Sequence, residues 1–330
     1  MIRDEVIKAI ERRAPSYVPL VWFDHPEWSD IVCVAWNPAK GWQAKTPGET
    51  EWGYVFETLD PTRRNFGQVT HPLANNWDAI LKIKAPAPDA PGRFEHIADF
   101  ARSYPDKYVM GNMGISGFGT MTGIRGFSEL LEGLYTDPDK VIALAEMVFG
   151  FERGLIRQFA RNGVNGIAFW DDWGTQQALM IDPDQWRKFF RPLYQRQFAL
   201  CHELGLHVFF HSCGQVTAIV NDLIEIGVDM LNLSQMTLYM EEVAAIGAGR
   251  TCFVCPVDFQ RTLYADRQTI KDQIARLIKL FGNGGGIIGQ TENYTHLGCD
   301  YEISRFIADT FCELGGRPVR HRTLVGIQKR

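Results

Sequence analysis

Long apolar runs are missing from this chain, and none approaches the roughly 18 residues that a membrane-spanning helix requires. The amino terminus passes directly into a charged, amphipathic helix pattern, without the apolar stretch of a secretory signal peptide. We therefore expect a cytoplasmic protein with no membrane partner.

Clusters of basic residues are missing too. The formal net charge is -5, and Lys and Arg nowhere form a run. Proteins that bind nucleic acid neutralise its phosphates with clustered Lys and Arg. We therefore expect no nucleic-acid partner.

Marks of two other protein classes are also absent. The seven cysteines are odd in number and scattered, which fits reduced thiols and metal ligands better than a framework of disulfides. No Gly-x-Gly-x-x-Gly follows the first expected strand, so a dinucleotide-binding fold lacks its usual fingerprint.

What the chain does have is a regular alternation of strand-like and helix-like segments from residue 108 onward. Strands are expected at 108–113, 166–170, from 206, 230–233, 252–257 and 286–289, and helices at 127–135, 138–162, 183–204, 216–226, 240–247, 267–281 and 301–314. The earlier signals are shorter and broken by prolines: a helix over 3–13, strands over 17–23 and 31–36, and a hairpin piece over 51–59. Such alternation predicts right-handed βαβ units and a parallel sheet.

Six regular strands, with one or two before them, favour closure into a (β/α)8 TIM barrel, an α/β fold. A doubly wound open sheet is the alternative. We expect a single domain over 1–330, in which about 1–105 form an irregular amino-terminal part and 106–330 form the regular βα units.

Polar, chemically capable residues stand at the ends of seven expected strands. They are Asp24 and His25, Asn112, Asp171 and Asp172, His211 and Cys213, Ser234 and Gln235, Asp258 and Gln260, and Gln290 and Glu292. A barrel brings the carboxyl ends of its strands to one rim, where the active sites of this fold lie. A capped turn explains any one of these residues, but a catalytic rim explains the set. We take Asp171, Asp172, Asn112 and Gln235 as candidate catalytic residues.

The His-x-Cys pair at the end of the strand from 206 carries the most specific chemistry. Residues two apart on an extended chain point the same way, so His211 and Cys213 can bind one metal ion. The alternative is a core histidine beside a buried cysteine. Gly214 and the helical spacing over 216–226 place the pair at the carboxyl end of a βα unit, which favours the metal site.

Two other patterns lie close to this rim. Small residues and glycines over 114–123 predict a flexible loop after a strand. Cys252 and Cys255 have the spacing of a metal or redox motif, but on a strand their thiols point to opposite faces. We expect no joint site from them.

Taken together, the motifs resemble those of the uroporphyrinogen decarboxylase-like superfamily, and within it the zinc-dependent methyltransferases that work with corrinoid proteins. The motifs are Glu51-Trp52-Gly53, His71-Pro72-Leu73, residues 125–131 with Asp137-Pro138 after them, residues 171–176, residues 211–214, Asp258-Phe259-Gln260 and residues 285–288. The resemblance covers nearly the whole chain.

This resemblance implies a TIM barrel in which His211 and Cys213 match zinc ligands. Members of the methyltransferase branch supply a further cysteine just after the last strand, where this chain has Glu292 and Asn293. Glu292 can serve there as an oxygen ligand, and Cys299 can serve if the loop between them folds back. Both remain candidates for the third ligand.

The activity implied is methyl transfer between a small substrate, such as a methyl ether, a thiol or a pterin, and the cobalt of a corrinoid (cobalamin) carried by a partner protein. The alternative is a metal-free decarboxylase acting on a carboxylated ring. Relatives of that branch have an arginine-rich loop after the first strand, whereas residues 23–30 here are acidic and aromatic. Because this loop repels a polyanion, we expect a neutral or weakly charged substrate. A homodimer is compatible with the sequence.

Overall fold

The computed structural model describes residues 1–58, 67–73, 76–234 and 236–317. Eight strands form one sheet in the order β1-β10-β9-β8-β7-β6-β5-β2, and every hydrogen-bonded pair in it is parallel. The strands are β1 (Leu20–Trp22), β2 (Ile31–Ala35), β5 (Tyr108–Ile115), β6 (Gly166–Trp170), β7 (His207–Ser212), β8 (Met230–Leu233), β9 (Cys252–Cys255) and β10 (Ile287–Thr291).

One residue joins the two ends of this sheet. The backbone N–H of Asp30, just before β2, donates to the carbonyl of Leu20 in β1 at 2.8 Å. Its carboxylate accepts the N–H of the same Leu20 at 3.0 Å. The sheet therefore closes into a TIM barrel with a seam between β1 and β2, and the expected (β/α)8 fold is confirmed.

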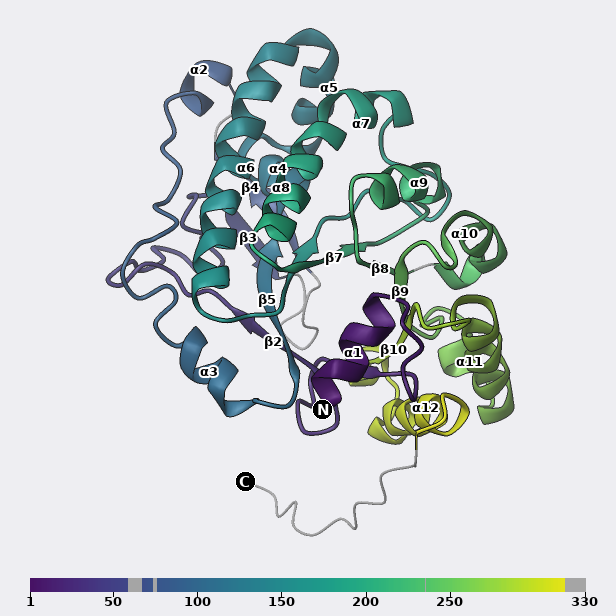
Figure 1. Ribbon diagram of the computed structural model, residues 1–330. Helices are drawn as coiled ribbons and strands as arrows, with labels where there is room; N and C mark the ends of the chain where they lie inside the picture. Colours follow the sequence, from purple (N-terminus) through teal and green to yellow (C-terminus); the bar gives the residue numbers. More distant parts are fainter. Residues whose placement is uncertain (59–66, 74–75, 235, 318–330) are drawn as a thin grey trace.

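Helices surround the outside of the barrel (Figure 1). They are α4 (Gly117–Arg125), α5 (Phe127–Thr136), α6 (Pro138–Arg161), α7 (Pro183–Phe189), α8 (Arg191–Glu203), α9 (Thr217–Glu225), α10 (Met240–Gly247), α11 (Arg267–Phe281) and α12 (Tyr301–Leu314), with the 3-10 turns η1 (Met236–Leu238), η2 (Thr262–Tyr264) and η3 (Tyr294–Leu297). In the part of the chain that the structure describes, no helix combines the length and the hydropathy needed to cross a bilayer.

The amino-terminal part adds elements to this frame. Helix α1 (Ile2–Ile10) buries Val6, Ala9 and Ile10 against residues of the barrel interior. The connection from β2 to β5 contains the antiparallel hairpin β3 (Val55–Thr58) and β4 (Gly67–His71), and the short helices α2 (Trp77–Ile80) and α3 (Ile97–Ser103). The hairpin piece expected over 51–59 corresponds to β3, which pairs with β4; residue 59 lies outside the described residues.

A buried ion pair holds this long connection together. The guanidinium of Arg93, which is inaccessible to solvent, donates two hydrogen bonds to the carboxylate of Glu51, at 2.5 and 3.0 Å. Arg93 also donates to the carbonyls of Asn37 and Ala87, at 3.2 and 2.8 Å, and lies over the ring of Trp36. Arg93 thus ties together the parts of the connection that contain Asn37, Glu51 and Ala87.

Two expected elements were wrong. The helix expected over 183–204 is divided at Phe190, because Pro192 has no N–H for the carbonyl four residues earlier and its ring crowds that carbonyl. The flexible loop expected over 114–123 instead contains the end of β5, Ser116 and most of α4. Two buried carboxylates from other elements accept the first N–H groups of α4, and this compensates for its glycines.

Alternation along the strands decides which side chains reach the barrel mouth. Interior positions near the amino end carry apolar residues such as Met110, Ala168 and Phe209, while outward residues pack against the helices. Two residues further along each strand, the interior positions carry Asn112, Trp170, His211, Asn232 and Gln290. The same alternation places Cys252 inside and Cys255 outside, as expected.

Candidate metal site at the carboxyl rim

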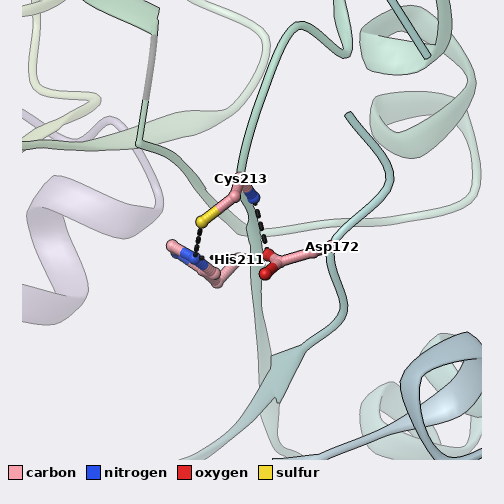
Figure 2. Close-up of side chains that lie close together, drawn as sticks. All are labelled: Asp172, His211 and Cys213. Carbon is pink, nitrogen blue, oxygen red and sulfur yellow. Dashed lines mark hydrogen bonds and ion pairs between the residues drawn. The ribbon is translucent and has the colours of Figure 1, made fainter. Parts of the chain in front are cut away.

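Three side chains from two neighbouring strand ends converge at the rim (Figure 2). The Nε2 atom of His211 lies 3.4 Å from Sγ of Cys213 and 3.7 Å from an oxygen of Asp172. All three candidate ligand atoms lie within 4.8 Å of one another. Among the described residues, this is the one group of three or more His, Cys, Asp or Glu with such geometry.

Two of the three separations fit a tetrahedral zinc ion. Zinc bonds of about 2.3 Å to sulfur and about 2.0 to 2.1 Å to nitrogen and oxygen imply ligand atoms about 3.4 to 3.6 Å apart. The observed distances of 3.4 and 3.7 Å differ from these by a few tenths of an ångström. Imidazole, thiolate and carboxylate are all established zinc donors, and three of them leave a fourth position open.

Close contact between two glycines brings the loops after β6 and β7 together. A Cβ atom on Gly214, which has φ of +81°, would lie 2.1 Å from the carbonyl oxygen of Gly174. The N–H of Gly174 in turn donates to the carbonyl of Cys213 at 3.1 Å. The N–H of Cys213 also donates to the carboxylate of Asp172 at 2.7 Å. Glycine at both positions therefore allows Asp172 to reach the His-x-Cys pair.

Asn232 fixes the tautomer of His211. The Nδ2 group of Asn232 donates to the carbonyl of Val254 at 2.7 Å and to Gln290 at 2.6 Å. A carbonyl can only accept, so the amide oxygen of Asn232 faces Nδ1 of His211, at 2.6 Å. Nδ1 must then carry the proton, and Nε2 keeps its lone pair toward Cys213 and Asp172. Metal-binding histidines are held in the same way.

The thiol of Cys213 is protonated when no metal is bound. Burial, followed by the negative charge of Asp172, raises its pKa to about 12, against a smaller opposing effect of the nearby Ser234 hydroxyl. Ser234, predicted at the end of its strand, is thus beside the thiol. A metal ion must displace the thiol proton, so binding will release a proton.

Asp171 points away from this group. Its side chain is 1% exposed and its two oxygens accept the N–H groups of Phe118 and Gly119, at 2.8 and 2.9 Å, in the first turn of α4. The hydroxyl of Tyr194 donates to the same carboxylate. Successive residues leave an extended chain on opposite sides, which is why Asp172 faces the mouth and Asp171 does not.

Glu292 and Cys299 lie outside the three-residue group. Strands β9 and β8 separate β10 from β7 in the sheet, whereas β6 is directly beside β7. The strand order therefore favours Asp172 over Glu292 at the third position. Cys299 follows the turn η3, which carries the chain on toward α12. The sequence predicted a third ligand from the last βα loop, whereas the structure brings Asp172 to the His-x-Cys pair from the end of the neighbouring strand.

The remaining candidates are placed as follows. Asn112 faces the mouth from β5, and its side-chain oxygen accepts the N–H of Gly114 at 2.8 Å. Gln235 lies outside the described residues. Asn232, which the sequence analysis missed, is the polar member of an otherwise apolar strand. Its position two residues after Met230 puts it on the same face of the strand as Met230, and this spacing could have identified it from the sequence.

The protein is thus a TIM barrel, and the side chains that could hold a metal ion lie on its carboxyl rim, which is the usual place for an active site in this fold. The model of the uroporphyrinogen decarboxylase (URO-D) family matches residues 59–301, and the chain belongs to this family. The resemblance stated from the motifs is confirmed at this level. No curated protein matches the chain.

Two solved structures are similar to the chain to different degrees. A methyltransferase from Methanosarcina mazei has a TM-score of 0.70 at 15% sequence identity, over 94% of this chain and 98% of that one. D-psicose 3-epimerase, solved in the presence of D-fructose, has a TM-score of 0.47 at 9% identity, over 94% of this chain and 93% of that one. At 15% identity, the likeness to this methyltransferase supports the barrel fold and its extent over nearly the whole chain.

Proposed function

We propose that this protein is a cytoplasmic, zinc-dependent methyltransferase that moves a methyl group between a small substrate and the cobalt of a corrinoid protein. The observation that carries the proposal is the group formed by Asp172, His211 and Cys213 on the carboxyl rim. The likeness to the Methanosarcina mazei methyltransferase supports it.

The three side chains would hold zinc through one oxygen, one nitrogen and one sulfur. Bound there, zinc supplies Lewis acidity at an open position, which favours a thiolate over a thiol or polarises an ether oxygen. Asn232 keeps the lone pair of His211 on the side of the metal. Asp172 holds the backbone of Cys213 and so fixes the direction of the thiol.

Charges at the rim indicate the kind of substrate. Burial, followed by the negative charge of Asp24, raises the pKa of Glu292. These two carboxyl groups therefore lie close together at the rim, and Asp172 adds a third. Each like-charge contact with a carboxylated substrate would cost on the order of 1 kcal/mol. A neutral or weakly charged substrate fits this rim, with the corrinoid protein docking over it.

The alternative is a metal-free decarboxylase acting on a carboxylated ring. The family match favours it, because the family carries that name. The acidic and aromatic residues over 23–30 disfavour it, since a polycarboxylate requires cations.

Three incubations of purified protein test the proposal after elemental analysis of its metal. The first contains methylcobalamin and a thiol, the second reduced cobalamin and a methyl ether, and the third uroporphyrinogen. We expect zinc close to one per chain and methyl transfer in at least one of the first two. Decarboxylation in the third without transfer in the others would overturn the proposal.

A further inference from the structure

Two aromatic side chains form the floor of the barrel mouth. Phe23, just after β1, and Trp170, the last residue of β6, both pack on the buried interior and both remain partly exposed. Their ring centroids lie 5.7 Å apart, with an angle of 67° between the planes. The ring of Trp170 also lies 5.5 Å from that of Phe209, which is buried one layer deeper. The two rings thus cover the interior, and their exposed parts face the mouth.

The contact between these two rings crosses the barrel. Strands β2 and β5 lie between β1 and β6 in the closed sheet, so the rings meet over the interior and not along the wall. Cys33 of β2 adds a partly exposed apolar side chain at the same level. Asn112 of β5 is polar, but its side-chain oxygen already accepts the N–H of Gly114. This half of the mouth therefore offers mainly apolar surface.

The metal group lies at the edge of this floor. Trp170 and His211 are paired in the register of β6 and β7, and their ring centroids lie 4.8 Å apart. On the other side of His211, strands β8 and β10 provide the amides of Asn232 and Gln290. The Nε1 atom of Trp170 is buried and has no hydrogen-bond partner among the described residues. The mouth is therefore open to carbon atoms of the indole and not to its N–H.

We propose that Phe23 and Trp170 bind the flat ring of an aromatic substrate whose thiol or ether group lies at the metal group. This inference rests on the proposed function and narrows its substrate to aromatic thiols and aromatic methyl ethers. Aromatic rings attract one another in offset stacked and edge-to-face arrangements, and two rings at a steep angle allow both. An uncharged ring also meets no like-charge repulsion from Asp172 at the rim.

Two thiols of similar size test the floor without any methyl transfer. Benzyl mercaptan carries a flat aromatic ring, and cyclohexylmethanethiol carries a saturated ring with the same number of carbons. In calorimetric titrations of zinc-loaded wild type at one pH, we expect tighter binding of benzyl mercaptan by about threefold to tenfold. Because the two thiols differ in acidity, this preference is compared between variants, and the zinc content of each variant is measured.

The variants separate ring binding from a general loss of packing. Phe23→Leu and Trp170→Leu should reduce the preference for benzyl mercaptan, whereas Trp170→Phe, which keeps an aromatic ring, should retain most of it. Phe127→Leu is the control, because Phe127 is exposed on α5, and it should behave as wild type. A crystal structure of the zinc-loaded protein with benzyl mercaptan should place the ligand ring within about 4 Å of Phe23 or Trp170.

The outcomes distinguish failure of the aromatic floor from failure of the proposed function. An unchanged preference in Phe23→Leu and Trp170→Leu, a ligand ring directed at Asn232 and Gln290, or failure of both thiols to bind would overturn the aromatic floor alone. If Trp170→Leu loses zinc, Phe23→Leu decides, because β1 does not pair with β7. Absence of zinc from the purified wild type would overturn the proposed function, and the role of the floor with it.

Discussion

The carbonyl of Val254 determines the tautomer of His211 through a single amide, that of Asn232. Replacing that amide with an apolar side chain of similar size leaves the imidazole free to rotate or to change tautomer. We expect Asn232→Leu to weaken zinc binding by about 10 to 100-fold, measured by competition with a chelator.

Asn221, exposed on α9, provides a control. Asn221→Leu should bind zinc as tightly as wild type, because its amide interacts only on the surface with Glu225 and Arg250. Unchanged affinity in Asn232→Leu would show that the amide does not orient the ligand.

Cys213 and Cys299 make a matched pair for the identity of the ligands. The geometry gives Cys213 a place in the metal group and leaves Cys299 outside it. We expect Cys213→Ala to purify without zinc and Cys299→Ala to retain it, as elemental analysis will show. Both variants should keep the circular dichroism of wild type, because a ligand on a preformed barrel does not build its core. Zinc retained by Cys213→Ala and lost by Cys299→Ala would reverse the assignment.

The first turn of helix α4 is stabilised by carboxylates that come from other elements. Glu152 on α6 accepts the N–H of Gly117 at 2.6 Å and a hydrogen bond from Gln197. Burial raises the pKa of Glu152 to about 7. Because the folded protein binds this proton more tightly than the unfolded chain does, the contribution to stability is complete below about pH 4.5 and is lost as pH rises to about 7.

Replacing Glu152 with glutamine removes this titration. Between pH 5 and pH 8 the free energy of unfolding of wild type should fall relative to Glu152→Gln, by up to about 3 kcal/mol. Urea unfolding at several pH values measures the difference. Glu146→Gln, on the same helix but at the surface, should follow wild type. Parallel curves for wild type and Glu152→Gln would refute the expectation.

The connection between β2 and β5 depends on Arg93. Removing one partner of a buried ion pair leaves the other charge without compensation, at a cost of about 3 to 5 kcal/mol. We expect Arg93→Met to lower the free energy of unfolding by that amount in urea titrations. Arg102→Met breaks an exposed pair with Asp99 and should cost less than about 1 kcal/mol. Similar values for the two variants would contradict the importance of burial.

Periodicity located most elements, because strands and helices of this barrel differ clearly in the spacing of apolar residues. It failed at α4, where glycines suggested a loop and the stabilising acids, Glu152 and Asp171, lie far along the chain. It failed again at Phe190, where the expectation ignored Pro192. Local sequence therefore predicts elements whose stability is local and misses those completed from elsewhere.

The candidate site also has a part that the local sequence predicts and a part that it does not. His211 and Cys213 could be paired from sequence, because their spacing alone sets their common direction. The position of Asp172 beside them depends on the meeting of two loops at Gly174 and Gly214, and the amide of Asn232 comes from a different strand. Contacts between strand ends require the order of strands, which the motifs do not contain.

For the molecule as a whole, α1 has a consequence for the order of events during turnover. It packs Val6, Ala9 and Ile10 against interior residues at the amino end of the barrel, which leaves the carboxyl rim as the expected entrance. Under the proposed function, a small substrate would enter before the corrinoid protein covers that rim, and its product would leave after that protein departs. Steady-state kinetics should show a compulsory order, with a saturating corrinoid protein inhibiting the entry of substrate. Random-order kinetics would point to a second entrance.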